Sequence, residues 1–277
     1  MHPRFASVVF IVAWIGMLLS AVAVAQEPAD DPSCDTHIHL EAAALRESTA
    51  LASILTLLQT PEARAAVGVP ETAWQLLQTC SVVSAHVCGA SSDSPYLLIE
   101  AVTSNPRVVE QALRGAMDSG AFLSVQVTDS GIVAVVSPPG AAPPSLEALT
   151  LPVPPTNPTD PSPQLVIALD PGASERYHPL ARGQSSLSVS LTAEMTMMWT
   201  HSTSDSETAL DVAAQARALV ELGASSPMTA AGGVSELIRQ ARIEVRGTQV
   251  TVNLAADATQ VQRLMNLVAE VIESELP

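Results

Sequence analysis

The stretch from 138 to 163, which reads PPGAAPPSLEALTLPVPPTNPTDPSP, constrains the folding of this chain more than any other feature. Ten of its 26 residues are proline. Proline has no backbone N–H and a fixed φ, so the stretch predicts neither a helix nor a central strand. We expect an extended linker, or a strap lying over a surface, between two folded halves at 26–137 and 164–277.

Residues 1–25 have the pattern of a secretory signal peptide. Arg4 supplies a positive start, residues 6–22 are almost all apolar, and Ala23-Val24-Ala25 provides the small residues that a signal peptidase needs. An uncleaved membrane anchor is the alternative, because about 20 apolar residues can span a bilayer. No later segment is long and apolar enough to span. We therefore expect export to the periplasm or the outside of the cell, with no membrane span after cleavage.

The charge balance is strongly acidic, with a formal net charge of −16. Such a surface repels nucleic acid and anionic lipid headgroups, so neither is an expected partner. The chain contains no lysine, and every basic residue apart from histidine is arginine. This excludes Schiff-base chemistry and a carboxylated-lysine metal bridge, and it indicates a GC-rich bacterial source.

Both halves predict an α+β fold in which an antiparallel sheet is covered on one face by helices. The two sheets are expected to be separate and to be joined by the Pro-rich linker. Alternating apolar residues and turn signals place the strands, and caps and prolines place the helices. The expected strands are 36–40, 81–87, 96–102, 122–128, 132–137, 165–169, 187–191, 195–201 and a hairpin over 242–254. The expected helices are 43–59, one starting at Pro70, 105–120, 205–222 capped by Ser204, 231–241, and a last one capped by Asp257.

Three stretches resemble features of exported bacterial proteins to which no activity is assigned. They are LEAAALR at 40–46, the Pro-rich stretch 138–163, and VRGTQVTVNL at 245–254. The resemblance spans most of the chain after the signal peptide. It implies two α+β halves behind a signal peptide, and it implies no activity.

The stretch DTHIHL at 35–40 resembles the Asp-x-His-x-His signature of metal-dependent amidohydrolases. Strand alternation places His37 and His39 on one face, so both imidazoles could bind one Zn²⁺ that activates a water. The bridging lysine of that family is absent. Its barrel also needs about 250 residues in eight βα units, whereas this chain predicts hairpins. A short motif outside its structural context favours coincidence.

Two interpretations of DTHIHL remain. In the first, Ile38 and Leu40 face the core while Asp35, His37 and His39 occupy a more solvated face. In the second, His37 and His39 join His86 of a neighbouring strand to bind zinc or another transition metal without a hydrolase fold. The other histidines after the signal peptide, His178 and His201, have no accompanying Asp or Glu pattern.

Cys34, Cys80 and Cys88 are the cysteines of the chain. In an exported protein two of them should pair. Cys80 and Cys88 bracket one expected strand, and eight strand residues span about 26 Å, which is beyond disulfide reach. A bridge should therefore join Cys34 to Cys80 or to Cys88, and the sequence leaves open which.

The sequence thus predicts an exported, non-catalytic protein without a cofactor. We expect it to act in the bacterial envelope, through binding or structural contacts with an envelope protein or ligand that the sequence does not identify. The alternative is a metal-binding protein or metal-dependent hydrolase that uses His37 and His39.

Overall fold

The computed structural model describes residues 34–88, 96–116, 121–137, 164–169, 183–225, 229–230, 233–274 and 276. The expected signal peptide, the Pro-rich stretch, His178 and the side chain of Asp35 lie outside this description. The chain divides into two compact units. The first contains 1–46, 57–155 and 272–277, and the second contains 47–56 and 156–271.

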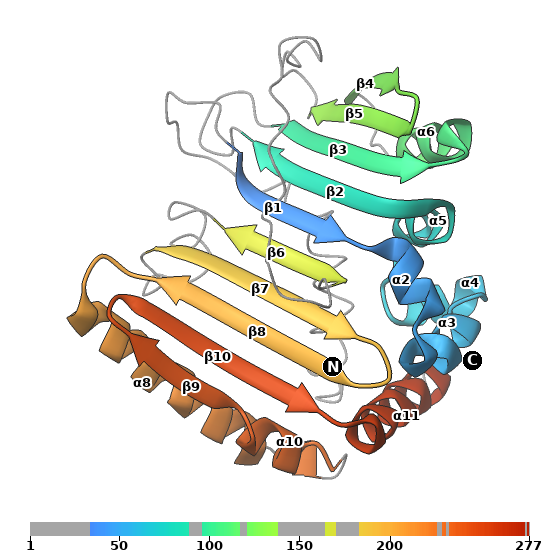
Figure 1. The fold of residues 1–277 in the computed structure, drawn as a ribbon. Coiled ribbons are helices and arrows are strands. Elements are labelled where there is room, and N and C mark those ends of the chain that lie inside the picture. Colours follow the sequence, from blue (N-terminus) through green and yellow to red (C-terminus); the bar gives the residue numbers. More distant parts are fainter. Residues whose placement is uncertain are drawn as a thin grey trace. The chain divides into compact units, whose positions relative to one another are not determined.

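The first unit contains every strand that the sequence predicted for the first half (Figure 1). These are β1 (Cys34–Leu40), β2 (Cys80–Cys88), β3 (Tyr96–Thr103), β4 (Phe122–Val127) and β5 (Gly131–Ser137). They pair antiparallel in the order β4-β5-β3-β2-β1. The apolar alternation and the short Asp-Ser turn between β4 and β5 explain why these residues form strands.

The helices between β1 and β2 differ from the single helix expected over 43–59. The chain instead forms α2 (Ala42–Glu47), a 3₁₀ turn η3 (Thr49–Leu51) and α3 (Ala52–Leu57). Ser48 interrupts the helix: its backbone is extended, and its hydroxyl donates to the carbonyl of Thr192 at 3.2 Å. Serine competes for backbone hydrogen bonds in this way, which is why it weakens helix interiors.

Three further helices follow the proline and capping signals of the sequence. They are α4 (Pro61–Ala66), α5 (Glu71–Thr79) and α6 (Pro106–Gly115). Helices α5 and α6 start where Pro70 and Pro106 predicted. The sequence analysis missed α4, although its signal was present: the Thr60 hydroxyl accepts from the Ala63 N–H at 3.3 Å, and Pro61 takes the first helical position.

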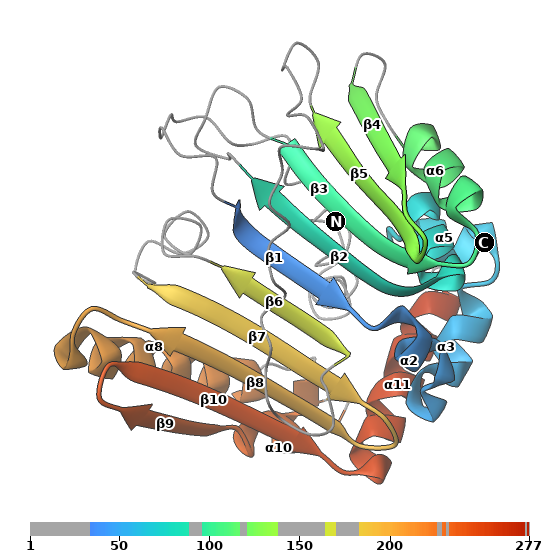
Figure 2. The ribbon, with the colours of Figure 1, turned by 45° about the horizontal axis from the view of Figure 1, so that its top comes forward.

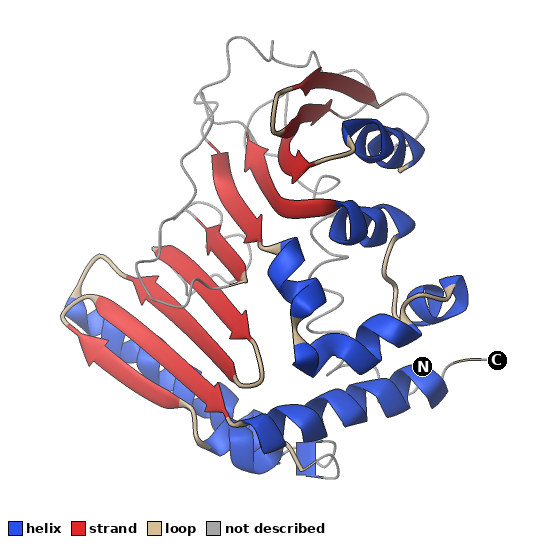
Figure 3. Cartoon of the chain, turned by 45° about the vertical axis from the view of Figure 1, so that its right-hand side comes forward, coloured by secondary structure: helices blue, strands red, loops and turns tan. Residues whose placement is uncertain are grey.

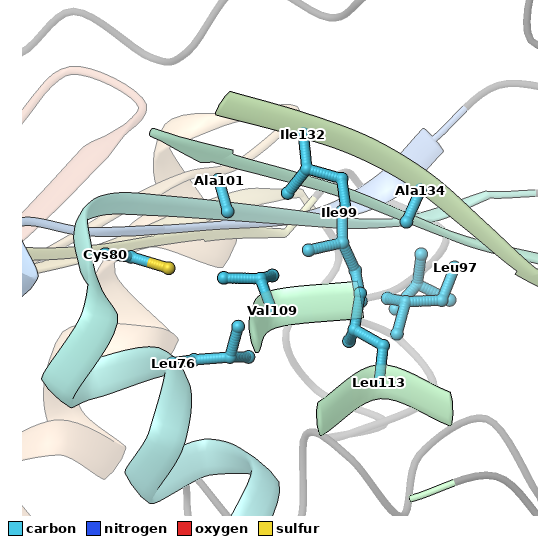
Figure 4. Packing of buried hydrophobic residues seen from close by; sticks show 10 residues of the cluster. Leu76, Cys80, Leu97, Ile99, Ala101, Val109, Leu113, Ile132 and Ala134 are labelled. Carbon is cyan, nitrogen blue, oxygen red and sulfur yellow. The ribbon is translucent and has the colours of Figure 1, made fainter. Parts of the chain in front are cut away.

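The main core of the first unit lies between α5, α6 and one face of the sheet (Figure 4). Val109 of α6 is fully buried there, beside Leu113 of the same helix and Leu76 of α5. The buried strand residues are Cys80, Val87, Leu97, Ile99, Ala101, Ile132 and Ala134. In β3 and β5 these are every second residue, as expected when one face of a sheet is packed against helices, and in β2 the irregular pairing between Cys80 and Val82 brings Cys80 to the same face as Val87.

The second unit is built on the same plan. Its strands β6 (Leu165–Leu169), β7 (Gln184–Leu191), β8 (Met195–Ser202), β9 (Arg242–Arg246) and β10 (Gln249–Ala256) pair antiparallel in the order β6-β7-β8-β10-β9. Helix α8 (Ser206–Ser225) lies against one face of these strands (Figure 3), where Ala209, Val212 and Ala213 pack with Val250. The remaining helices are α10 (Ser235–Arg239) and α11 (Ala258–Ser274).

The helix caps of the second unit are partly those expected. Asp257 caps α11, because its carboxylate accepts from the Gln260 N–H at 2.9 Å. Asp205, not Ser204, caps α8: its carboxylate accepts from the Thr208 N–H at 2.8 Å. Hydrogen bonds from the Thr208 backbone and hydroxyl hold the pKa of Asp205 below its usual value. Asp is as good a cap as Ser, so spacing alone did not separate them.

The strand order of the whole chain is β4-β5-β3-β2-β1-β6-β7-β8-β10-β9, which counts as one sheet of ten strands. The α+β class is therefore confirmed, and the expectation of two separate sheets was wrong. Apolar alternation identifies strands and their faces, but a strand at the edge of a sheet and a strand paired on both sides have the same alternation. The pattern therefore does not say where a sheet ends. Among the described residues, no helix is long and apolar enough to cross a membrane.

Candidate functional site

The candidate site is the face of the first unit's sheet that lies opposite α5 and α6. In the antiparallel register, His37 pairs with His86 and His39 pairs with Ser84. Ser84 in turn pairs with Glu100 of β3. Directly opposed residues share a face. We call this group, His37, His39, Ser84, His86 and Glu100, the histidine face.

His37 and His86 contact each other directly. Their Nδ1 atoms are 2.8 Å apart, and the two rings meet edge to face with centroids 5.1 Å apart. At this distance a single proton lies between the two Nδ1 atoms, so one ring donates it and the other accepts it. The side chain of His86 is almost completely buried, at 1% exposure.

The carboxylate of Glu100 favours one of the two possible donors. Its Oε2 atom lies 3.9 Å from Nε2 of His86, which is too far for a hydrogen bond but close enough for the negative charge to act. The charge favours the His86 tautomer that carries its proton on Nε2. In that tautomer Nδ1 of His86 accepts from Nδ1–H of His37. Nε2 of His86 is buried without a hydrogen-bond partner among the described residues.

His39 belongs to a second chain of polar groups. Its Nε2 atom lies 3.0 Å from Oε1 of Glu41, and its Nδ1 atom lies 3.0 Å from Oγ of Ser84. The carboxylate accepts from Nε2–H, so Nδ1 accepts from the serine hydroxyl. The side chains of His39 and Glu41 are partly exposed, at 21% and 34%.

The order carboxylate, imidazole, hydroxyl is also that of an acyl-transfer triad, which makes Ser84 a nucleophile to consider. Its surroundings do not support that role. Ser84 is buried and lies in the middle of β2, between β1 and β3. Backbone N–H groups of an inner strand bond to neighbouring strands and are not available to an oxyanion. The geometry is that of two cross-strand polar pairs.

The proposed metal ligands are only partly brought together. His37 and His86 meet, whereas His39 bonds to Ser84 and Glu41 instead. Within the described part of the chain, no group of three or more His, Cys, Asp or Glu side chains is arranged to hold a metal ion. His37 and His39 are half-buried, so the face is drier than the solvated face expected for them.

His201 lies in the second unit and is unrelated to this face. It is fully buried, and its Nδ1 atom lies 2.6 Å from Oγ of Ser185. Its ring stacks on Trp199 with centroids 5.5 Å apart. Burial lowers the pKa of His201 below its usual value.

A disulfide joins Cys34 to Cys88 at the end of the β1–β2 pair nearest His86. This selects one of the two pairings that the sequence left open. The antiparallel direction of β1 and β2 places Cys34 opposite Cys88 and leaves Cys80 at the far end of β2. Cys80 is free and buried, and burial raises the pKa of its thiol.

Sequence reasoning missed the carboxylates and the hydroxyl that bond to the histidines. Glu41 was within reach of the sequence, because it lies two residues after His39. Ser84 and Glu100 required the strand register. Counting in register from Cys34 and Cys88 would pair His37 with Ala85 and His39 with Val83; the irregularity between Cys34 and Thr36 shifts the pairing by one residue, to His86 and Ser84.

The comparisons with known proteins identify no family for this chain. No family profile matches the chain, and no curated protein matches it. A solved structure titled "Structure of crystal form I of TP0453" aligns with 89% of this chain and 96% of its own, at 12% sequence identity and a TM-score of 0.41. A TM-score this low does not establish a shared fold.

Proposed function

We propose that this chain is an exported, non-catalytic protein that acts in the bacterial envelope through binding or structural contacts. The observation that carries the proposal is the pairing within the histidine face. The polar groups that could do chemistry there bond to one another across strands, and the serine among them is buried. The Cys34–Cys88 disulfide supports the exported part, because such bonds persist in oxidising compartments and are rare in the cytosol.

Export is tested by expressing the full chain in a Gram-negative host and fractionating the cells. We expect the protein in the periplasm, shortened at its N-terminus. After denaturation without reductant, a thiol reagent should label Cys80 alone. Full-length protein in the cytosol with all three cysteines labelled would refute export.

The non-catalytic part is tested on the same preparation with activated ester and amide substrates. We expect no turnover above that of the Ser84→Ala variant, because Ser84 is the nucleophile that any acyl transfer at this face would use. Turnover that disappears in Ser84→Ala and in His39→Gln would refute the proposal.

A second candidate function, metal binding, is favoured by one observation, the 2.8 Å contact between Nδ1 of His37 and Nδ1 of His86. Two nitrogens bound to one tetrahedral Zn²⁺ at about 2.0–2.1 Å stand about 3.4 Å apart. The rings would therefore have to separate by only about half an ångström for a metal to replace the shared proton. Such a two-histidine site would need its other ligands from water or a partner.

Elemental mass spectrometry of the purified chain separates the two candidates. A bound metal should disappear in His37→Gln/His86→Gln and remain in His39→Gln, which leaves the pair intact. The absence of metal after incubation with zinc, followed by desalting, would refute the second candidate and leave the first unaffected.

A further inference from the structure

Strand β4 forms an edge that lacks the usual protection against strand pairing. It bonds to β5 on one side, and no described strand lies beyond it (Figure 2). Its sequence, FLSVQV, contains no charged residue and no proline. Two of its side chains are well exposed: Phe122 at 47% and Val127 at 56%. Natural edge strands normally carry charges, prolines or bulges, because their unpaired backbone groups attract other strands.

The other end of the strand order shows that protection. Strand β9 alternates Arg242, Glu244 and Arg246 with apolar residues, and all three charged residues are exposed. Arg246 and Glu244 form an ion pair at 2.9 Å. One chain thus contains a charged edge strand and an uncharged one, so the composition of the chain as a whole does not explain the lack of charge on β4.

The hydrogen-bond pattern identifies which residues of β4 offer their backbone to a partner. The Thr128 N–H donates to the Gly131 carbonyl at 3.0 Å, which makes this facing pair a hydrogen-bonded one. Bonded and non-bonded pairs alternate along an antiparallel ladder. Leu123, Val125 and Val127 therefore direct their N–H and C=O groups away from β5, toward the open edge.

These residues also share the core face. Leu123, Val125 and Val127 pair with Val136, Ala134 and Ile132 of β5, whose side chains belong to the core beneath α6 or pack against it. An added strand with apolar residues at the matching positions would extend that core and cover Val127.

We propose that β4 pairs antiparallel with β4 of a second copy of this chain, around a two-fold axis at Val125. In this register Val125 faces Val125 and Leu123 faces Val127, and each facing pair exchanges two backbone hydrogen bonds. All facing side chains on the core face are apolar. The nearest carboxylate, Asp129, falls opposite Ala121 of the second copy and not opposite another acid.

Charge explains why the second copy would bind at this edge. Two molecules with a net charge of −16 repel each other over most of their surface. An uncharged strand that is complementary to itself is a place where contact costs little electrostatic energy and backbone hydrogen bonds stabilise the pair. The exposed Phe122 lies on the opposite face from Val127, where this register places it opposite Thr128 of the second copy.

Sedimentation equilibrium of the purified, exported chain tests the proposal. We expect a reversible dimer whose dissociation constant rises at least about tenfold in Val127→Lys, because that substitution opposes a charge to Leu123 of the second copy. The matched control is Val102→Lys. Val102 is a similarly exposed valine, at 44%, on the inner strand β3, and its replacement should leave the dimer unchanged.

Single cysteine substitutions test the register independently of folding losses. Under a mild oxidant, Val125→Cys should form a disulfide-linked dimer, because that residue faces itself across the two-fold axis. Leu123→Cys should not, since its facing residue is Val127. A chain that stays monomeric up to about 100 μM, far above typical micromolar affinities, would refute the proposal. A dimer whose dissociation constant is unchanged in Val127→Lys would also refute the proposal, because the two copies would then be in contact through a surface other than β4.

Discussion

The disulfide of the first unit gives the most quantitative prediction. Cys34 and Cys88 are separated by 54 residues along the chain. In the chain-entropy description, closing a loop of this length lowers the entropy of the unfolded state enough to stabilise the fold by about 4 kcal/mol. The free energy of unfolding of a domain is about 5–15 kcal/mol, so the bond accounts for a large share of it.

The perturbation is the Cys34→Ala/Cys88→Ala double variant, compared with each single variant. Either single substitution already breaks the bond, so each should lower the free energy of unfolding about as much as the double variant does. Cys80→Ala is the control. It removes a fully buried thiol but leaves the disulfide, and we expect a loss of about 1 kcal/mol.

Guanidinium unfolding followed by tryptophan fluorescence measures these losses in the correct unit. Trp74 lies in α5 of the first unit and Trp199 in β8 of the second. In a Trp199→Phe background, Trp74 reports the unit that contains the disulfide. A loss below about 1 kcal/mol in the double variant, or additive losses in the single variants, would refute the reasoning.

Three other substitutions test separate features, each by guanidinium unfolding. Arg64→Met removes buried hydrogen bonds to two carbonyls and to Glu71, and should cost about 2–4 kcal/mol; the exposed Arg114→Met should cost under about 1. Gly131→Ala places a Cβ against a β3 carbonyl oxygen and should cost about 1–3 kcal/mol, whereas Gly115→Ala, which has open space, should not destabilise. Burial lowers the pKa of His201, so its contribution to stability should be complete above about pH 6.5 and be lost as the pH falls below that value; the loss of stability in this range should be smaller in His201→Phe. Equal losses within either pair, or an acid profile unchanged in His201→Phe, would contradict these expectations.

Strand positions could be predicted from the sequence because they depend on local patterns. In β7 and β8, apolar residues at alternate positions, such as Leu187 and Trp199, are those that face α8. Helix ends were predicted where a proline or an aspartate marks them, as at Pro106 and Asp257. The break at Ser48 was not predicted, because the carbonyl that its hydroxyl contacts belongs to residue 192, far along the chain.

The candidate site could be predicted only in part for the same reason. Alternation correctly placed His37 and His39 on one face, and His86 was correctly proposed as a neighbour of His37. The bonds of His39 to Ser84 and Glu41 depend on a register between strands that lie far apart in the sequence. The local pattern therefore identified which residues could meet, and the register decided which of them do.

The disulfide and the histidine face lie on the same pair of strands, β1 and β2, on two sides of a shift in register. A slip of one residue between β1 and β2 would turn His37 and His39 toward the helices and bring Ile38 to the opposite face. The β1–β2 pairing is irregular between Cys34 and Thr36, at the end where the bond lies. The covalent link from Cys34 to Cys88 holds this end of the two strands together and limits how far the segment that carries His37 can slip past His86. The α+β fold needs only the alternation, whereas the contact between these two imidazoles also needs this register, which the disulfide at the end of the two strands helps to hold.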